Sequence, residues 1–402
     1  MSTSHLAVLG GKPEFEETLH VGRPNVGDRV RLAERFDEVL DRVWFTNNGP
    51  MVQKFEQTLA NRFAVRHVIA VCNATLGLEI ATRAAGVEGE VVVPSFTFVA
   101  TAHAIQWQGL TPVFADVVPS THLIDVDSVE SLITPRTTAI LGVHTWGVGC
   151  ETEALQRLAA RKGLTVMYDA AHAIGCTHRG RPFGSNGLAE VLSFHATKYV
   201  NSFEGGAIAT NDDALAERIR HMVNFGFEGP DLVTSVGTNA KMSEISAAMG
   251  LTSLESEPSF AHQNRIIWDA YTEQFATLPG LSLYTFPEKE INSRQYVVVE
   301  VAEECALSRD EIVAVLHAEN CMARRYFFPG VHRMEPYASL APMSTRWLPN
   351  TEALTRRVLT LPTGTAMSPD LVGRVSTIIA SALTTPKEIA RSVARTAPFA
   401  SI

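Results

Sequence analysis

The stretch "SFHATKYVNSFEGGAIATND" (193–212) places one lysine, Lys198, between an apolar run typical of a β-strand and a Glu-Gly-Gly turn that opens a second such run. Burying an ammonium group without a partner costs free energy. Such a lysine is therefore a packing feature, an ion-pair partner or a nucleophile that forms a Schiff base. The stretch alone leaves these three roles open.

Between about residues 65 and 225, short apolar runs alternate with helix-like patterns. The strand-like runs are 67–72, 90–94, 111–116, 137–144 and the start of 164–175, and the helix-like runs are 75–85, 97–109 and 151–163. The short runs are apolar throughout, as expected for strands that a parallel sheet buries on both faces. The alternation predicts a doubly wound α/β domain, a mostly parallel sheet with helices on both faces.

The pattern changes after about residue 255. A strand-like run (295–301) and two helix-like runs (308–320 and 368–383) predict a smaller C-terminal α+β domain. We therefore expect an N-terminal arm (1–45), a large domain (46–255) and a small domain (256–402). The final stretch, 385–402, is expected to be partly disordered.

Composition excludes several classes of protein. The chain has 402 residues and a net charge of −9, which argues against a nucleic-acid-binding protein. No apolar run reaches the roughly 18 residues that span a bilayer, and the start lacks the pattern of a signal peptide, so we expect a cytoplasmic protein. The five cysteines are odd in number and lie far apart, and the 13 histidines lack metal-ligand spacing, so neither a disulfide framework nor a metal site is expected.

Polar residues stand where the predicted strands end, and in open α/β sheets ligands gather at the carboxyl ends of strands. Asn73, Ala74 and Thr75 begin a helix whose free N–H groups suit a phosphate, although a plain N-cap is the commoner role. Asp169 ends a later strand, where it either caps a turn or holds a cationic nitrogen. An aspartate and a lysine at neighbouring strand ends suit pyridoxal phosphate: Lys198 forms the Schiff base, and Asp169 keeps the pyridine nitrogen protonated.

Two further residues fit this interpretation less specifically. Phe98 can stack on the cofactor ring, although an aromatic residue on a helix that faces a sheet more often belongs to the core. His172 can reach the ring's phenolic oxygen or cap a turn. Each of these residues alone is a weak signal for pyridoxal phosphate. Their order at the strand ends (helix start, aromatic, aspartate, serine and lysine) is a more specific one, and it favours this cofactor.

From about residue 10 to 385 the chain resembles the DegT/DnrJ/EryC1/StrS family of sugar-nucleotide aminotransferases, which are fold type I pyridoxal phosphate enzymes. The similar segments occur in the family's order: "FTNNGPMVQKFE", "CNATLGLEIA", "VPSFTFVATA", "VFADV", "YDAAHAIG", the lysine stretch, "GTNAKMSEISAAMGL" and "LPTG". The resemblance implies the fold, the cofactor and a homodimer whose active sites lie at the subunit interface.

The resemblance also implies residue roles. Lys198 is the implied Schiff-base lysine and proton shuttle, and Asn239 is expected to reach the cofactor phosphate of the neighbouring subunit. His172 stands where the family commonly has glutamine, so its protonation state becomes a question. The implied cofactor-binding residues are Ala74, Thr75, Phe98, Asp169, His172, Ser193 and Asn239, with the backbone at Leu76 also on the phosphate.

The implied reaction moves an amino group from glutamate to a nucleotide-linked keto sugar, most specifically to C4 of dTDP-4-keto-6-deoxyglucose. Dehydrating relatives carry histidine in place of the lysine, so Lys198 favours transamination. The alternatives are a C3-aminating or dehydrating relative, or a catalytically silent regulatory paralogue. Lys241 stands where arginine is frequent, and the basic candidates suit a solvated surface equally well. The candidate substrate-binding residues are Asn48, His195, Lys241, Arg324, Arg325, Tyr326 and His332.

Overall fold

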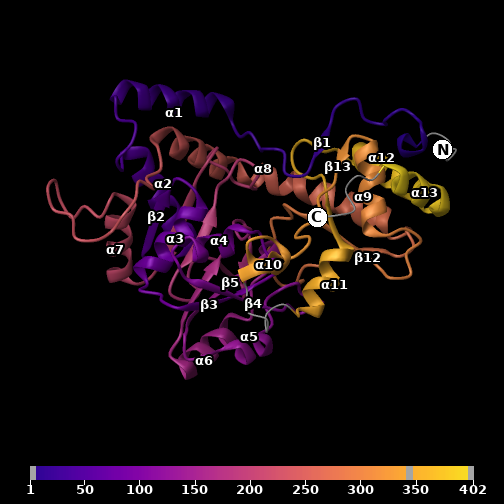
Figure 1. The fold of residues 1–402 in the computed structure, drawn as a ribbon. Helices are drawn as coiled ribbons and strands as arrows, with labels where there is room; N and C mark the ends of the chain where they lie inside the picture. The colour runs from indigo at the N-terminus through magenta and orange to yellow at the C-terminus, as the bar shows by residue number, and fades with distance from the viewer. Residues whose placement is uncertain (1–5, 341–346, 397–402) are drawn as a thin grey trace.

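The computed structural model describes residues 6–340 and 347–396 (Figure 1). Its largest sheet has seven strands, which are β2 (His67–Val71), β3 (Glu90–Pro94), β4 (Thr111–Ala115), β5 (Thr137–Val143), β6 (Thr165–Asp169), β9 (Glu190–Ser193) and β10 (Gly206–Thr210). Their order is β2-β10-β9-β6-β5-β3-β4. β10 runs antiparallel to both of its neighbours, and the remaining pairs are parallel. The predicted mostly parallel α/β sheet is confirmed.

Helices cover both faces of this sheet. They are α2 (Pro50–Phe63), α3 (Ala74–Ala84), α4 (Ala100–Gln106), α5 (Val126–Leu132), α6 (Thr152–Lys162) and α7 (Asp213–Val223). Successive side chains of a strand point to opposite faces. In β2, Val68 and Ala70 pack with α2, whereas Ile69 and Val71 pack with α3, α4 and α7. Two-sided burial explains why this strand is apolar throughout.

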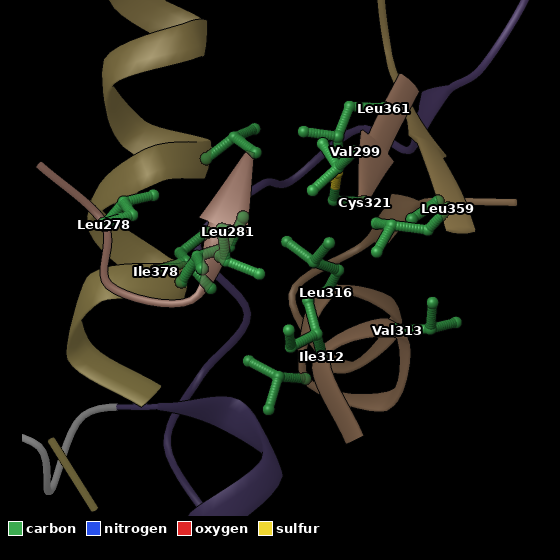
Figure 2. Close-up of a cluster of buried hydrophobic side chains, with 14 of the residues drawn as sticks. Leu278, Leu281, Val299, Ile312, Val313, Leu316, Cys321, Leu359, Leu361 and Ile378 are labelled. Carbon is green, nitrogen blue, oxygen red and sulfur yellow. The ribbon is translucent and has the colours of Figure 1, made fainter. Parts of the chain in front are cut away.

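A second, smaller core lies toward the C-terminus. An antiparallel sheet of β11 (Leu281–Leu283), β12 (Val297–Val301) and β14 (Val358–Leu361) packs with α9 (Arg309–Ala318) and α12 (Pro369–Leu383). Figure 2 shows Val299 and Leu361 of this sheet above Ile312 and Leu316 of α9. The long helix α8 (Glu244–Phe275) contributes to this core and to the core under α2. The expected boundary at residue 255 falls inside α8, and the domain division stays a prediction.

The C-terminal stretch differs from expectation, because α13 (Pro386–Thr396) is a helix. Proline at the first helical position suits a helix start. Ile389 and Val393, one turn apart, pack against the smaller core, and this burial holds the helix in place. Partial disorder was therefore the wrong prediction for residues 386–396, and residues 397–402 lie outside the described residues.

The N-terminal segment contacts both cores. Leu6 and Phe15 are buried in the smaller one, and β1 (Leu19–His20) pairs with β13 (Cys321–Met322). Figure 1 shows the chain then crossing to α1 (Arg29–Arg42), which lies along α8. The remaining elements are η2 (Ala7–Leu9), η3 (Thr145–Gly147), β7 (Thr177–His178), β8 (Arg181–Pro182), η4 (Val331–Arg333), α10 (Tyr337–Leu340) and α11 (Pro349–Arg357). Across residues 6–340 and 347–396, no helix is both long and apolar enough to cross a membrane.

Candidate active site

A cavity of about 370 Å³ opens at the carboxyl ends of β2, β5, β6 and β9. Gln295, Tyr296, Arg324, Tyr326 and Phe327, which belong to the C-terminal half of the chain, close its other side. The cavity brings together eleven of the residues singled out from sequence: Asn73, Ala74, Thr75, Phe98, Asp169, His172, Ser193, His195, Lys198, Arg324 and Tyr326.

One end of the cavity is the start of α3. Asn73 is the N-cap, and its side chain accepts a hydrogen bond from the Leu76 N–H at 2.9 Å. A Cβ at Gly206 would stand 2.7 Å from the Ala74 nitrogen, so only glycine lets β10 approach the helix start this closely. Ser193 lines the same cavity with a nearly buried hydroxyl group. A helix start with free amides and a hydroxyl beside it suits a phosphate.

Asp169 is the last residue of β6 and is 6% exposed. Its carboxylate accepts hydrogen bonds from the Ala171 N–H at 3.0 Å and from the Thr101 hydroxyl at 2.8 Å. Burial raises the pKa of Asp169, while these hydrogen bonds and the nearby Lys198 oppose the rise. A buried carboxylate of this kind is stabilised by a cationic nitrogen placed against it.

Lys198 lies in the connection between β9 and β10, as the sequence predicts. Its Nζ donates a hydrogen bond to the Tyr296 hydroxyl at 3.2 Å. Burial lowers the pKa of Lys198 to about 8, and Asp169 and Tyr326 act in the opposite direction. The amine therefore loses its proton far more readily than an exposed lysine near neutral pH, as a nucleophile or general base requires.

His172 is neutral, with its proton on Nε2. The main-chain N–H of Trp146 donates to Nδ1 at 3.2 Å, so Nδ1 carries the lone pair. The two rings are stacked, with centroids 5.9 Å apart. Burial lowers the pKa of His172 well below its ordinary value, and Lys198 acts in the same direction. The imidazole is thus able to donate one hydrogen bond from Nε2.

Phe98 lies in the turn before α4 rather than in the helix, and it is 57% exposed. It lines the cavity, so the core role that sequence reasoning weighed for it does not apply. Gln295 and Tyr296 were missed. Their only signal is that they open the strand-like run 295–301, which says nothing about the distant Lys198.

Several candidates lie elsewhere. Asn48 and Lys241 line a separate hollow of about 230 Å³, in which the Lys241 amine donates to Asn224 at 2.9 Å. Asn239 is exposed and pairs with Asn224 in an isolated β-bridge. The three residues do not join the cavity of their own chain.

Two further substrate candidates also stand outside the cavity. His332 is buried, with Nδ1 2.6 Å from the Ser95 hydroxyl and Nε2 3.4 Å from Glu352. Arg325 is exposed and forms an ion pair with Asp310 at 3.2 Å. Of the basic candidates, His195 and Arg324 line the cavity.

The profile of the DegT/DnrJ/EryC1/StrS aminotransferase family matches residues 28–380. The chain belongs to this family. It is 36% identical over 362 residues to a dTDP-4-amino-4,6-dideoxy-D-glucose transaminase of Shigella dysenteriae, with 89% of this chain and 97% of the relative aligned. An Escherichia coli enzyme of the same name is 33% identical over 365 residues, covering 90% and 98%. The crystal structure of DesI in the presence of its TDP-sugar product superposes with a TM-score of 0.92 at 49% identity, covering 97% of this chain and 99% of that one.

Members of this family are pyridoxal phosphate-dependent sugar aminotransferases, so the chain is a sugar-nucleotide transaminase with that cofactor. The cavity fits the group. Its helix start suits the phosphate, its buried carboxylate suits the protonated pyridine nitrogen, and Lys198 lines the same cavity.

Proposed function

We propose that this aminotransferase moves an amino group from glutamate to C4 of dTDP-4-keto-6-deoxyglucose. The names of its relatives and the TDP-sugar product of DesI support the substrate class. The observation that carries amino transfer is the cavity's lysine amine near a buried aspartate, since a silent paralogue or a dehydrating relative would be expected to lose one of them. We further propose that it works in the cytoplasm, in deoxyamino-sugar biosynthesis for a natural product or a surface polysaccharide.

Pyridoxal phosphate, when bound, supplies the electron sink that makes the proton on the reacting carbon acidic. In our proposal the start of α3, Thr75 and Ser193 hold its phosphate. Asp169 keeps the pyridine nitrogen protonated, and His172 donates Nε2–H to the phenolic oxygen. Phe98 covers one face of the ring.

Lys198 is the proposed proton carrier. Its Nζ takes the proton from Cα of the amino donor, and in the second half of the cycle it delivers a proton to C4 of the sugar. A pKa near 8 suits both tasks, because the amine accepts and releases a proton at little cost near neutral pH.

The nucleotide end of the substrate needs cations. Arg324, His195 and Tyr326 line the cavity, Arg324 and Tyr326 from the C-terminal half of the chain and His195 from just beyond β9. We propose that they contact the diphosphate, whose binding energy is remote from the reacting carbon and can be used to orient it.

NMR of the product tests this proposal. With dTDP-4-keto-6-deoxyglucose and glutamate we expect an amine on C4 and stoichiometric 2-oxoglutarate. A 3-keto isomer and the matching GDP-linked 4-keto sugar serve as comparison substrates and should react far more slowly. An amine on C3, a dehydrated product or preference for the GDP sugar would contradict the substrate assignment.

We also propose a homodimer in which Asn239 serves the partner's cavity. The connection that carries Asn239 projects beyond α7 (Figure 1) and bears exposed apolar side chains, Phe225, Leu232, Val233 and Val236. Exposed apolar residues gathered on one projection are typical of a surface that a partner covers. A second copy would bury them and bring Asn239 to a cavity other than its own.

Subunit mixing tests this arrangement. Lys198→Met and Asn239→Ala should each be inactive as homodimers, while a hybrid has one intact site. Random 1:1 mixing should restore roughly a quarter of wild-type activity, since half of the dimers are hybrids with one of two sites intact. Lys198→Met mixed with Asp169→Ala is the matched control without rescue, because both residues belong to the same chain's cavity. Hybrids that form and stay inactive would count against site sharing.

A further inference from the structure

The segment that enters β12 reaches across the molecule to Lys198. Tyr296 immediately precedes β12, whose sheet belongs to the smaller core, yet its hydroxyl is the hydrogen-bond partner of the Lys198 Nζ. The Tyr296 ring lies 4.5 Å from the His172 ring and packs edge-on against Trp146 at 5.2 Å. These contacts on two sides fix where the hydroxyl points.

Gln295, the preceding residue, forms hydrogen bonds to the main chain beside Lys198 and to the main chain at His172. Its side-chain oxygen accepts from the Tyr199 N–H at 3.1 Å, next to Lys198 in sequence. Its side-chain nitrogen donates to the His172 carbonyl at 2.9 Å. The Gln295 amide therefore links the segment that carries Lys198 to the turn that carries His172. One of its hydrogen bonds satisfies a main-chain N–H of the first segment, and the other satisfies a main-chain carbonyl of the second.

Neighbouring residues anchor this pair. Asn292 donates to the Trp146 carbonyl at 3.0 Å, and Trp146 in turn donates its N–H to His172. Asn264 of α8 donates to the Ser293 carbonyl at 2.8 Å. The segment is thus held at several points along its length, and Gln295 and Tyr296 are presented in fixed positions.

We propose that Gln295 and Tyr296 are positioning residues, which hold the Lys198 amine and His172 in the relative placement that proton transfer needs. The inference rests on the proposed role of Lys198. It assigns to the smaller core a direct influence on the catalytic amine, because both residues move with β12. Tyr296 acts through Lys198 and needs no contact with the sugar.

The Tyr296 hydroxyl also affects the pKa of Lys198. As an acceptor from Nζ, it stabilises the protonated amine. Burial raises the pKa of Tyr296, so the phenol itself stays neutral. The titratable groups around the amine are Asp169, His172, Tyr296 and Tyr326.

Tyr296→Phe in the cofactor-loaded enzyme removes the hydroxyl and keeps the ring. We expect the pH at which the visible absorbance titrates to fall by about one unit, the size of one lost hydrogen bond to a charged group. Tyr284→Phe is the matched control, since Tyr284 is buried in the same hydrophobic cluster and its hydroxyl donates to the Thr121 carbonyl instead. A Tyr296→Phe titration that coincides with those of wild type and Tyr284→Phe overturns the proposal for Tyr296.

Gln295→Met removes both hydrogen bonds at similar volume. We expect unchanged cofactor content, a downward shift of the same titration and a loss of visible circular dichroism per bound cofactor, because the lysine and histidine no longer keep one arrangement. Gln263→Met is the control, because Gln263 lies on α8, makes one comparable hydrogen bond to the Met367 carbonyl and does not line the cavity. Wild-type spectra for Gln295→Met would overturn the role of Gln295.

Failure of the proposed role of Lys198 and failure of the positioning role of Gln295 and Tyr296 give different results. If borohydride reduction fixes no cofactor on Lys198 of the wild-type enzyme, the proposed role of the lysine is wrong. If the wild type is fixed and titrates normally while Tyr296→Phe and Gln295→Met match it, only the positioning role is wrong.

Discussion

Lys198→Met loses turnover by about 10³-fold or more, the expected result of removing a nucleophile and a proton carrier in one substitution. The methionine side chain keeps the length of the aliphatic stem, so the cavity stays filled and cofactor can still enter. Turnover with the sugar nucleotide measures the first effect, and mass spectrometry after borohydride reduction measures the loss of covalent attachment. A variant that completes catalytic cycles near the wild-type rate would show that another residue does this work.

The same substitution stabilises the cofactor-free protein. The unfolded chain keeps the lysine proton up to the ordinary pKa of 10.5, whereas burial makes the folded site release it near 8. Stability therefore rises with pH between these values, and below pH 8 the lysine costs free energy. We expect Lys198→Met to raise the free energy of unfolding at pH 7 by about 1 to 3 kcal/mol. That gain should vanish as the pH approaches 10.5. Lys54→Met, on the exposed face of α2, is the control that changes neither stability nor turnover.

The site residues that could be predicted from sequence are those that lie at or just beyond the carboxyl ends of strands. Asp169 ends a buried apolar run, and Asn73 follows one closely. The alternation of strand-like and helix-like runs therefore places both residues at the carboxyl edge of the sheet. Lys198 lies further along the connection that follows β9, the neighbour of β6 in the sheet. Local pattern and topology agree for these residues, and the fold class follows from the same runs.

The rest depends on contacts between segments that are distant in sequence. Tyr296 reaches Lys198 from another sheet, and nothing in its own neighbourhood signals that partner. Arg324 and Arg325 are adjacent basic residues, but alternate residues of an extended chain point to opposite sides. Arg324 lines the cavity while Arg325 pairs with Asp310, and composition alone does not say which is which.

Asp169→Asn is the second substitution with a large expected effect. The amide can replace the hydrogen bonds from Ala171 and Thr101 in part, but it carries no charge to keep the pyridine nitrogen protonated. We expect turnover to fall by roughly 10²-fold or more, because the electron sink weakens with the loss of that proton. Lys198 is untouched, so borohydride should still fix the cofactor. Single-turnover rates with the amino donor measure the effect.

Stability separates this role from a structural one. Burial raises the pKa of Asp169, so at pH 7 the ionised carboxyl of the cofactor-free protein costs stability, and that cost fades as the pH falls toward the ordinary value of 3.8. Asp169→Asn should therefore be at least as stable as wild type at pH 7. Asp116, also buried, accepts instead from the Asn350 and Thr351 N–H groups at the start of α11. Asp116→Asn should lose about 1 to 3 kcal/mol of stability, since the amide faces those donors with its own N–H groups, and keep its turnover. If both variants lose stability and keep turnover, Asp169 is a structural cap like Asp116 and not the partner of the cofactor.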